Sequence, residues 1–158
     1  MEIKLSLALP RDELSIPVVR HVLGQSMRTL GVRPTCMQDI QLAISEACTN
    51  VLDHAPAGSE YEVSAGIDDT MCVIEICDRG GGFQAEAVGQ AQAAPDAEQG
   101  RGIHLMRALV DQLAFTTRSA GGTVVRLEKL LEWEDDAPGK QLFDCASESP
   151  RASESPAR

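Results

Sequence analysis

The chain has 158 residues and a net charge of -10, and 43% of its residues are hydrophobic but only 3% aromatic. This length suits one domain, whose single core must consist mainly of aliphatic side chains. The negative charge repels nucleic-acid backbones and anionic lipid, and no basic stripe offsets it, so we expect no nucleic-acid partner. A nucleotide is not excluded, because backbone amides and a magnesium ion neutralise a triphosphate locally.

The cysteines and the lack of long apolar segments indicate the cellular compartment. The chain has five cysteines, without a CxxC pair or zinc-ligand spacing, and four lie inside apolar runs: Cys36, Cys48, Cys72 and Cys77. We expect these four to be reduced thiols in the core. No segment reaches the roughly 18 apolar residues of a membrane span, and the N-terminus has no cationic region. These features predict a cytoplasmic protein without a membrane partner.

The first part of the chain predicts one strand and two helices. Residues 3–9 alternate between apolar and polar side chains, which is the period of a half-buried strand. Residues 12–30 carry an imperfect helical stripe, which Gly31 and Pro34 terminate. Residues 35–54 give the clearest helix, because their apolar residues recur at intervals of three and four.

The second part predicts two strand pairs separated by a loop and a short helix. The predicted elements are strands at 61–67 and 71–77 around a turn at 68–70, a helix at 103–110, and strands at 113–118 and 123–131. Residues 83–99 are rich in Ala, Gln and Gly and predict a mobile lid. We expect the domain to span residues 1–133. The acidic segment 134–158, with its repeated Ser-Glu-Ser-Pro, predicts a disordered tail.

The central helix carries the first candidate site. Glu46 and Asn50 are four residues apart, so they lie on the same face of the helix, at the border of its apolar stripe. The Asn50 oxygen can bind Mg²⁺, and the Glu46 carboxylate can accept a proton from a nucleophile. Taken alone, such a pair more often marks a helix edge that faces water.

Two glycine motifs are further candidates. Asp78-Arg79-Gly80-Gly81-Gly82-Phe83 directly follows an apolar strand, where a buried aspartate can accept a hydrogen bond from an exocyclic amine such as that of adenine. An ordinary glycine turn is an equally good interpretation of this motif alone.

The second glycine motif is Gly100-Arg101-Gly102, which opens the predicted helix at 103–110. Free amides and the positive dipole end of that helix predict phosphate binding there. The motif is not a Walker A loop, because it lacks Gly-Lys-Ser/Thr. Arg101 is a candidate contact to the terminal phosphate, although an arginine in such a place is more commonly solvated.

Together, in this order and spacing, the three motifs resemble the ATP-binding domain shared by gyrase, the ninety-kilodalton chaperone, sensor histidine kinases and mismatch-repair ATPases, known as the GHKL or Bergerat fold (HATPase_c). The RsbW-like anti-sigma factors, which are small serine-protein kinases, are the most similar group. Residues 45–55, Ser-Glu-Ala-Cys-Thr-Asn-Val-Leu-Asp-His-Ala, look like their N box. The resemblance implies an α+β fold: a two-layer sandwich with a mixed, mainly antiparallel sheet and helices on one face.

The resemblance also implies roles for individual residues. It makes Glu46 the general base, Asn50 the Mg²⁺ ligand and Asp78 the adenine-binding residue. The remaining ATP-binding residues would be Gly80, Gly82, Gly100, Arg101, Gly102 and Thr123, and Arg20 on the first helix would contact a partner protein.

The function implied is that of an ATP-dependent serine-protein kinase and anti-sigma factor, which transfers the γ-phosphate of ATP to a serine of an anti-sigma antagonist and also binds a sigma factor. Homodimerisation is a further expectation from the family. The alternative is a non-catalytic binding module gated by ATP. A histidine kinase is disfavoured, because we expect too few residues before Glu46 for a phosphorylated-histidine segment. A gyrase-like ATPase is disfavoured, because we expect only an acidic tail where its transducer domain would follow.

Overall fold

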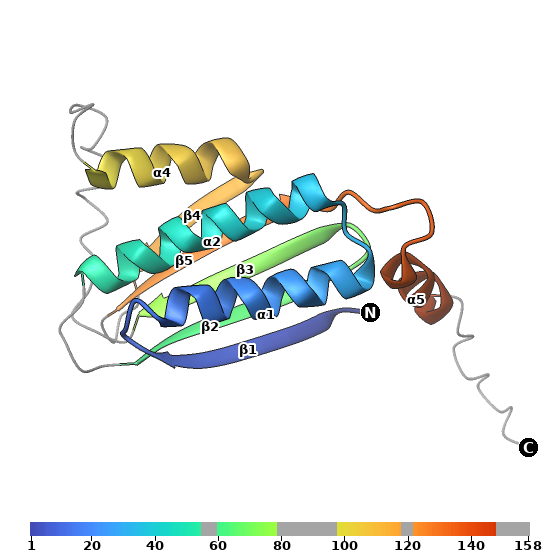
Figure 1. The fold of residues 1–158 in the computed structure, drawn as a ribbon, viewed down its shortest axis with the longest axis horizontal. Helices are drawn as coiled ribbons and strands as arrows, with labels where there is room; N and C mark the ends of the chain where they lie inside the picture. Colours follow the sequence, from blue (N-terminus) through green and yellow to red (C-terminus); the bar gives the residue numbers. More distant parts are fainter. Residues whose placement is uncertain (55–59, 79–97, 118–121, 148–158) are drawn as a thin grey trace, which may run out of the picture.

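The computed structural model describes residues 1–54, 60–78, 98–117 and 122–147. In chain order its elements are β1 (Ile3–Pro10), α1 (Ser15–Leu30), α2 (Pro34–His54), β2 (Glu60–Ile67), β3 (Met71–Asp78), α4 (Glu98–Leu109), β4 (Gln112–Thr117), β5 (Thr123–Leu130) and α5 (Pro138–Ser147). Figure 1 shows α1, α2 and α4 side by side on one face of the sheet. None of the helices in the described ranges is long and apolar enough to cross a bilayer.

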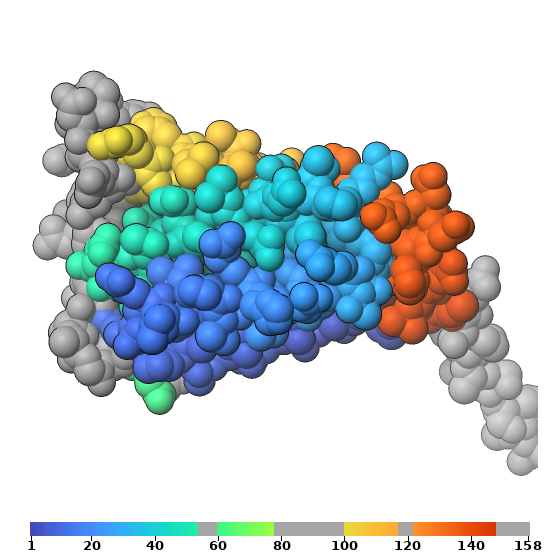
Figure 2. Space-filling model, in the orientation of Figure 1, coloured from blue at the N-terminus to red at the C-terminus, as the bar shows by residue number. Residues whose placement is uncertain are grey.

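The five described strands form one sheet in the order β1-β2-β3-β5-β4. Each pairing between them is antiparallel. This confirms the predicted α+β sandwich with a mainly antiparallel sheet, and no parallel pair occurs among the described strands. In the view of Figure 2, the helices hide most of the sheet beneath them.

The core lies between the helices and the sheet because both layers present an apolar face there. In β2, every second residue is buried: Tyr61, Val63, Ala65 and Ile67. In α2, all residues of the predicted stripe are buried: Ile40, Ala43, Ile44, Ala47, Cys48 and Val51. The periods of two and of about 3.6 residues therefore place these side chains in one common core.

The turn between β2 and β3 forms as predicted. The Asp68 side chain accepts hydrogen bonds from the amides of Thr70, at 2.8 Å, and Met71, at 2.7 Å. Asp favours turns for this reason, because its carboxylate satisfies backbone donors a few residues ahead.

The C-terminal segment corrects one prediction. Residues 138–147, expected to be part of a disordered tail, form α5, and Phe143 in this helix is only 4% exposed. Its ring meets Trp133 edge to face, with centroids 6.0 Å apart, and Trp133 Nε1 donates to the Asp69 carbonyl at 2.8 Å. The domain therefore continues past residue 133 to at least Ser147.

Helix α5 packs on the turn that ends α1. Gly31 has the left-handed φ of +83°, and its amide donates to the Arg28 carbonyl at 3.1 Å. A Cβ at Gly31 would stand 2.8 Å from the Cα of Ala137, so glycine is required both by the backbone conformation and by the close approach of the α5 segment.

Helix α4 begins at Glu98, five residues earlier than predicted. The last two residues of the expected lid, at 98 and 99, therefore belong to this helix, and the remainder of that segment, 83–97, lies outside the described residues.

The predicted core thiols are confirmed. Cys36, Cys48, Cys72 and Cys77 are buried and form no disulfide, whereas Cys145 on α5 is exposed. Burial raises the pKa of Cys48 and of Cys72 to about 12. Because the thiolate is the reactive form, these thiols are protected from modification in two ways: reagents cannot reach them, and they stay protonated.

We expect the native protein to contain one rapidly reacting thiol. Titration with a chromogenic disulfide reagent at pH 8 should modify one equivalent quickly, and unfolding in denaturant should expose all five. The Cys145→Ser variant should lose the fast phase and keep the other four thiols. More than one fast equivalent in the native protein would contradict the described burial.

Candidate functional site

The C-terminal half of α2 positions the first two candidate residues. Asn50 is only 9% exposed and Glu46 is half-buried, while Ala47 and Cys48 between them are fully buried in the core. Glu46 and Asn50 thus lie at the border of the buried stripe, as their spacing predicts. The helix presents a carboxylate and an amide side by side at the rim of the core.

The N-terminal part of α4 meets these two side chains. A Cβ on Gly102 would stand 2.9 Å from Glu46 Oε2 and 3.8 Å from Asn50 Oδ1. Because α4 begins at Glu98, Gly102 lies inside the helix and not ahead of it. Its amide is therefore not among the four free donors of the helix, which belong to residues 98–101. Gly102 thus allows the close approach of Glu46, and its predicted place in the nucleotide site stays a prediction.

The other two residues of the phosphate motif lie in the first turn of α4. Gly100 is buried and Arg101 is exposed. Their amides are among the free donors at the helix N-terminus, where the helix dipole favours an anion. The structure therefore brings Gly100 and Gly102 to the same end of the molecule as Glu46 and Asn50.

The ends of two neighbouring strands lie at this end of the molecule as well. Cys77 pairs with Val124, so the next residues outward, Asp78 and Thr123, occupy adjacent strand ends. Thr123 is buried, with 2% exposure. Figure 1 shows the end of α2, the start of α4, the end of β3 and the start of β5 together at the left.

Parts of the predicted site lie outside the described residues. These parts are Gly80, Gly82 and the side chain of Asp78. Arg20 is described, and it lies on the exposed side of α1, separate from the cluster on α2 and α4. Its backbone carbonyl accepts a hydrogen bond from Gln41 Nε2 at 3.0 Å.

The residues present suit a magnesium ion that is held largely by phosphates. The described ranges contain no group of three or more His, Cys, Asp or Glu side chains able to bind a metal. Mg²⁺ typically takes one or two protein oxygens and completes its shell with water and substrate phosphates. A single amide oxygen from Asn50, next to a helix N-terminus, fits that arrangement.

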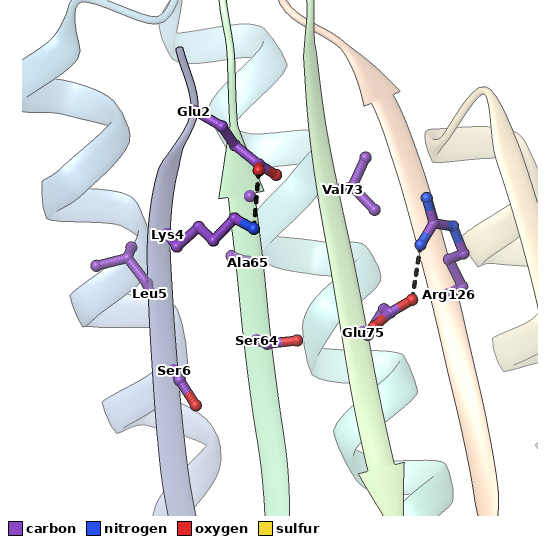
Figure 3. Close-up of a pocket in the computed structure, with 10 residues that line it drawn as sticks. Glu2, Lys4, Leu5, Ser6, Ser64, Ala65, Val73, Glu75 and Arg126 are labelled. Carbon is purple, nitrogen blue, oxygen red and sulfur yellow. Dashed lines mark hydrogen bonds and ion pairs between the residues drawn. The ribbon is translucent and has the colours of Figure 1, made fainter.

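A pocket of about 360 Å³ lies on the helix-free face of the sheet, away from Glu46 (Figure 3). It is lined by residues of β1, β2, β3 and β5, and its charges are paired. Lys4 Nζ lies 3.2 Å from Glu2, and Arg126 Nη1 lies 2.6 Å from Glu75. Since these cations already have carboxylate partners, this pocket is a poor site for a triphosphate.

A buried polar cluster beneath α2 was not among the features predicted from the sequence. Ser15 Oγ donates to the Asp12 carbonyl at 2.6 Å, which leaves the Tyr61 hydroxyl to donate to Ser15 Oγ at 2.5 Å. Burial raises the pKa of Tyr61 to about 12, and a hydrogen bond with Cys48 also contributes. The cluster thereby ties the helix that carries Glu46 to β2 and to the start of α1.

This cluster predicts a loss of stability at alkaline pH. The pKa values of Tyr61 and Cys48 rise from ordinary values of about 10 and 8.5 to about 12 on folding. Groups with raised pKa values stabilise the fold fully below their unfolded pKa, and this contribution is lost as the pH rises towards the folded pKa. The free energy of unfolding should therefore fall between about pH 8.5 and 12.

Denaturant titrations at pH 8, 9, 10 and 11 measure this dependence. Tyr61→Phe should be less stable than the wild type at pH 8, by about 1 kcal/mol for a lost hydrogen bond. Its stability should also fall less steeply above pH 10, because one of the groups whose pKa is raised on folding is gone. Equal slopes in the two proteins would exclude Tyr61 as a source of the pH dependence.

Comparison with known proteins finds relatives of the family that the sequence motifs resemble. The family described as "Histidine kinase-like ATPase domain" matches residues 9–129. The serine-protein kinase RsbW of Halalkalibacterium halodurans is 26% identical over 140 residues, which cover 83% of this chain and 85% of that protein. The anti-sigma F factor of Pasteuria penetrans is 34% identical over 104 residues, which cover 61% of this chain and 69% of that protein.

Two solved structures share the fold. The RsbU and RsbW domains of a Mycobacterium tuberculosis protein match with a TM-score of 0.63 and 23% identity, over 82% of this chain and 33% of that longer one. The SiaB-SiaC complex from Pseudomonas aeruginosa matches with a TM-score of 0.63 and 15% identity, over 78% of this chain and 88% of that one. At these identities, the likenesses support the fold alone.

Proposed function

The chain belongs to the histidine kinase-like ATPase domain family, and from this premise we propose that it is an ATP-dependent serine-protein kinase and anti-sigma factor. Its substrate would be a serine of an anti-sigma antagonist protein. The relatives named serine-protein kinase and anti-sigma F factor support this assignment. The observation that carries it is that Glu46 and Asn50 face α4 at Gly102, where an added Cβ would stand 2.9 Å from Glu46 Oε2 and 3.8 Å from Asn50 Oδ1.

This geometry suits phosphoryl transfer. The serine oxygen forms a bond to the γ-phosphorus, the bond from that phosphorus to the β,γ-bridging oxygen breaks, and ADP leaves with the electron pair. Glu46 accepts the serine proton, and the amides at the start of α4 hold phosphate oxygens. Asn50 would hold Mg²⁺, which neutralises charge on the phosphates when it is bound.

The other predicted residues complete the nucleotide site in this proposal. Asp78 accepts a hydrogen bond from the adenine amine, Thr123 lies beside it at the next strand end, and Gly80 and Gly82 let the backbone approach the ring. Arg101, exposed in the first turn of α4, contacts the terminal phosphate.

The proposed partners are proteins of a regulatory pathway in the cytoplasm. Besides the antagonist, the protein would bind a sigma factor and thereby regulate transcription, with Arg20 on the exposed side of α1 as a contact. A matching structure that is itself a two-protein complex supports the idea that this fold serves partner binding. A second copy of the chain is a further proposed partner.

A γ-phosphate transfer assay tests this function. The chain is incubated with Mg-ATP labelled in the γ-position and with antagonist-like proteins encoded near its gene. We expect label on a partner serine. ATP-dependent partner binding without transfer to any of them would replace the kinase by the alternative, a non-catalytic module gated by ATP. Absence of ATP binding would overturn both.

A further inference from the structure

Lys129 breaks the apolar pattern of β5. Val125 and Leu127 point from this strand into the core, and Lys129 is the next residue on the same face. Its side chain is 20% exposed. Together with Ile40, Val110 and Leu127, it lines a small apolar gap between α2, α4 and the sheet. A lysine held on the core-facing side of a strand calls for a specific partner.

Lys129 has partners on both helices. Its Nζ lies 3.1 Å from Asp39 Oδ2, near the start of α2, and donates to the Leu109 carbonyl, at the end of α4, at 2.7 Å. A cation at a helix C-terminus satisfies a free carbonyl and opposes the negative end of the dipole. One ammonium group therefore joins α2, α4 and β5.

The Lys129 contact and the Gly102 contact lie at opposite ends of the same helix pair. Asp39 and Glu46 are seven residues apart on α2, and Gly102 and Leu109 are seven residues apart on α4. At a rise of 1.5 Å per residue, both separations are about 10 Å, so the two antiparallel helices meet at two matched points. Gly102 meets Glu46 at one point, and Lys129 joins Leu109 to Asp39 at the other.

We propose that Lys129 is a positioning residue that fixes the register of α4 along α2. By holding the C-terminus of α4, it keeps the phosphate-binding N-terminus of this helix opposite Glu46 and Asn50. Since Asp39 is 41% exposed, solvent weakens the ion pair, and the hydrogen bond to the Leu109 carbonyl is the stronger of the two contacts that hold α4 in place. This inference rests on the proposed ATP site.

Titration of the full chain with Mg-ATP tests the proposal. Lys129→Met keeps the apolar stem and removes the charge. Helix α4 should therefore spend a smaller fraction of the time in the register that places its N-terminus opposite Glu46 and Asn50 and binds ATP. A fall of that fraction to a tenth would raise the apparent Kd about tenfold. Lys129→Arg, which keeps a cation, should restore the affinity to within about threefold. The matched control is Lys4→Met, which removes a lysine paired with Glu2 on the other face of the sheet and should leave the Kd unchanged.

The measurement separates positioning from a general folding defect. Irreversible misfolding would lower the number of binding sites per chain without changing the Kd. Reversible unfolding would raise the apparent Kd as a register shift does, so a denaturant titration without nucleotide must show that Lys129→Met is almost fully folded under the conditions of the assay. Asp39→Ala provides a second test at a more exposed residue, in case Lys129→Met does not fold. The Kd of Asp39→Ala for Mg-ATP should also rise. Wild-type affinity in both Lys129→Met and Asp39→Ala would overturn the inference. A wild-type chain that bound no ATP would instead overturn the proposed function.

Discussion

Glu46→Gln should lower phosphoryl transfer about 10²- to 10⁴-fold, the usual contribution of a general base, while Mg-ATP binding stays within about twofold. The two side chains have almost the same shape, so the amide can occupy the space that Glu46 fills against Gly102. A neutral amide, however, does not accept the serine proton. The effect should therefore fall on kcat and not on nucleotide affinity.

Transfer rates at saturating Mg-ATP measure kcat, and a separate nucleotide titration measures the affinity. Glu134→Gln is a suitable control, because Glu134 is exposed and its amide donates to the carbonyl of Gly31, in the turn between α1 and the start of α2, twelve residues or more along the chain from Glu46. It makes the same chemical change and should leave both quantities as in the wild type. Retention of wild-type kcat in Glu46→Gln would remove Glu46 from the proposed reaction.

Gly102→Ala should separate function from stability. Inside a helix, replacing Gly with Ala ordinarily stabilises by up to about 1 kcal/mol. Here the new methyl group would stand 2.9 Å from Glu46 Oε2, so the Glu46 side chain or the start of α4 must move. The end of a glutamate side chain can swing away at little cost to the fold. We therefore expect unchanged or slightly higher stability and a loss of transfer of about tenfold or more, as for other small misplacements of catalytic groups.

Thermal unfolding and the transfer assay, run on the same preparation, test this expectation. Gly66→Ala is the matched control: its Cβ would meet the side chain of Glu2, which is exposed near the chain terminus and free to move. This control should keep wild-type transfer. Equal transfer by Gly102→Ala and wild type would show that the close contact of Gly102 with Glu46 is not needed.

The elements that sequence patterning predicted best are those with a long periodic apolar face. The stripe from Ile40 to Val51 fixed both the extent of α2 and the border positions of Glu46 and Asn50, because helix geometry relates sequence spacing directly to a face. The alternation of residues 3–9 predicted β1 in the same way. Asp68 located the turn because its effect is local.

The features that were missed depend on contacts between distant segments. Helix α5 is short and mostly polar, and it is held by Phe143 and Trp133 against the end of α1, a contact that no local pattern reveals. Gly102 was read as a source of a free amide, because the helix start at Glu98 carries no strong periodic signal. Lys129 did leave a signal, a charge on the core-facing side of an alternating strand, but its partners are 90 and 20 residues away.

The position of α5 offers a practical route to observing the protein at work. This helix lies at the opposite end of α1 and α2 from Glu46 and Asn50 (Figure 1), and it carries Cys145, the exposed cysteine of the five. A maleimide dye or a sensor surface attached through this thiol would leave the nucleotide end of the molecule unobstructed. Single-site labelling of the natural sequence, without engineered cysteines, then suffices for binding and energy-transfer experiments in solution.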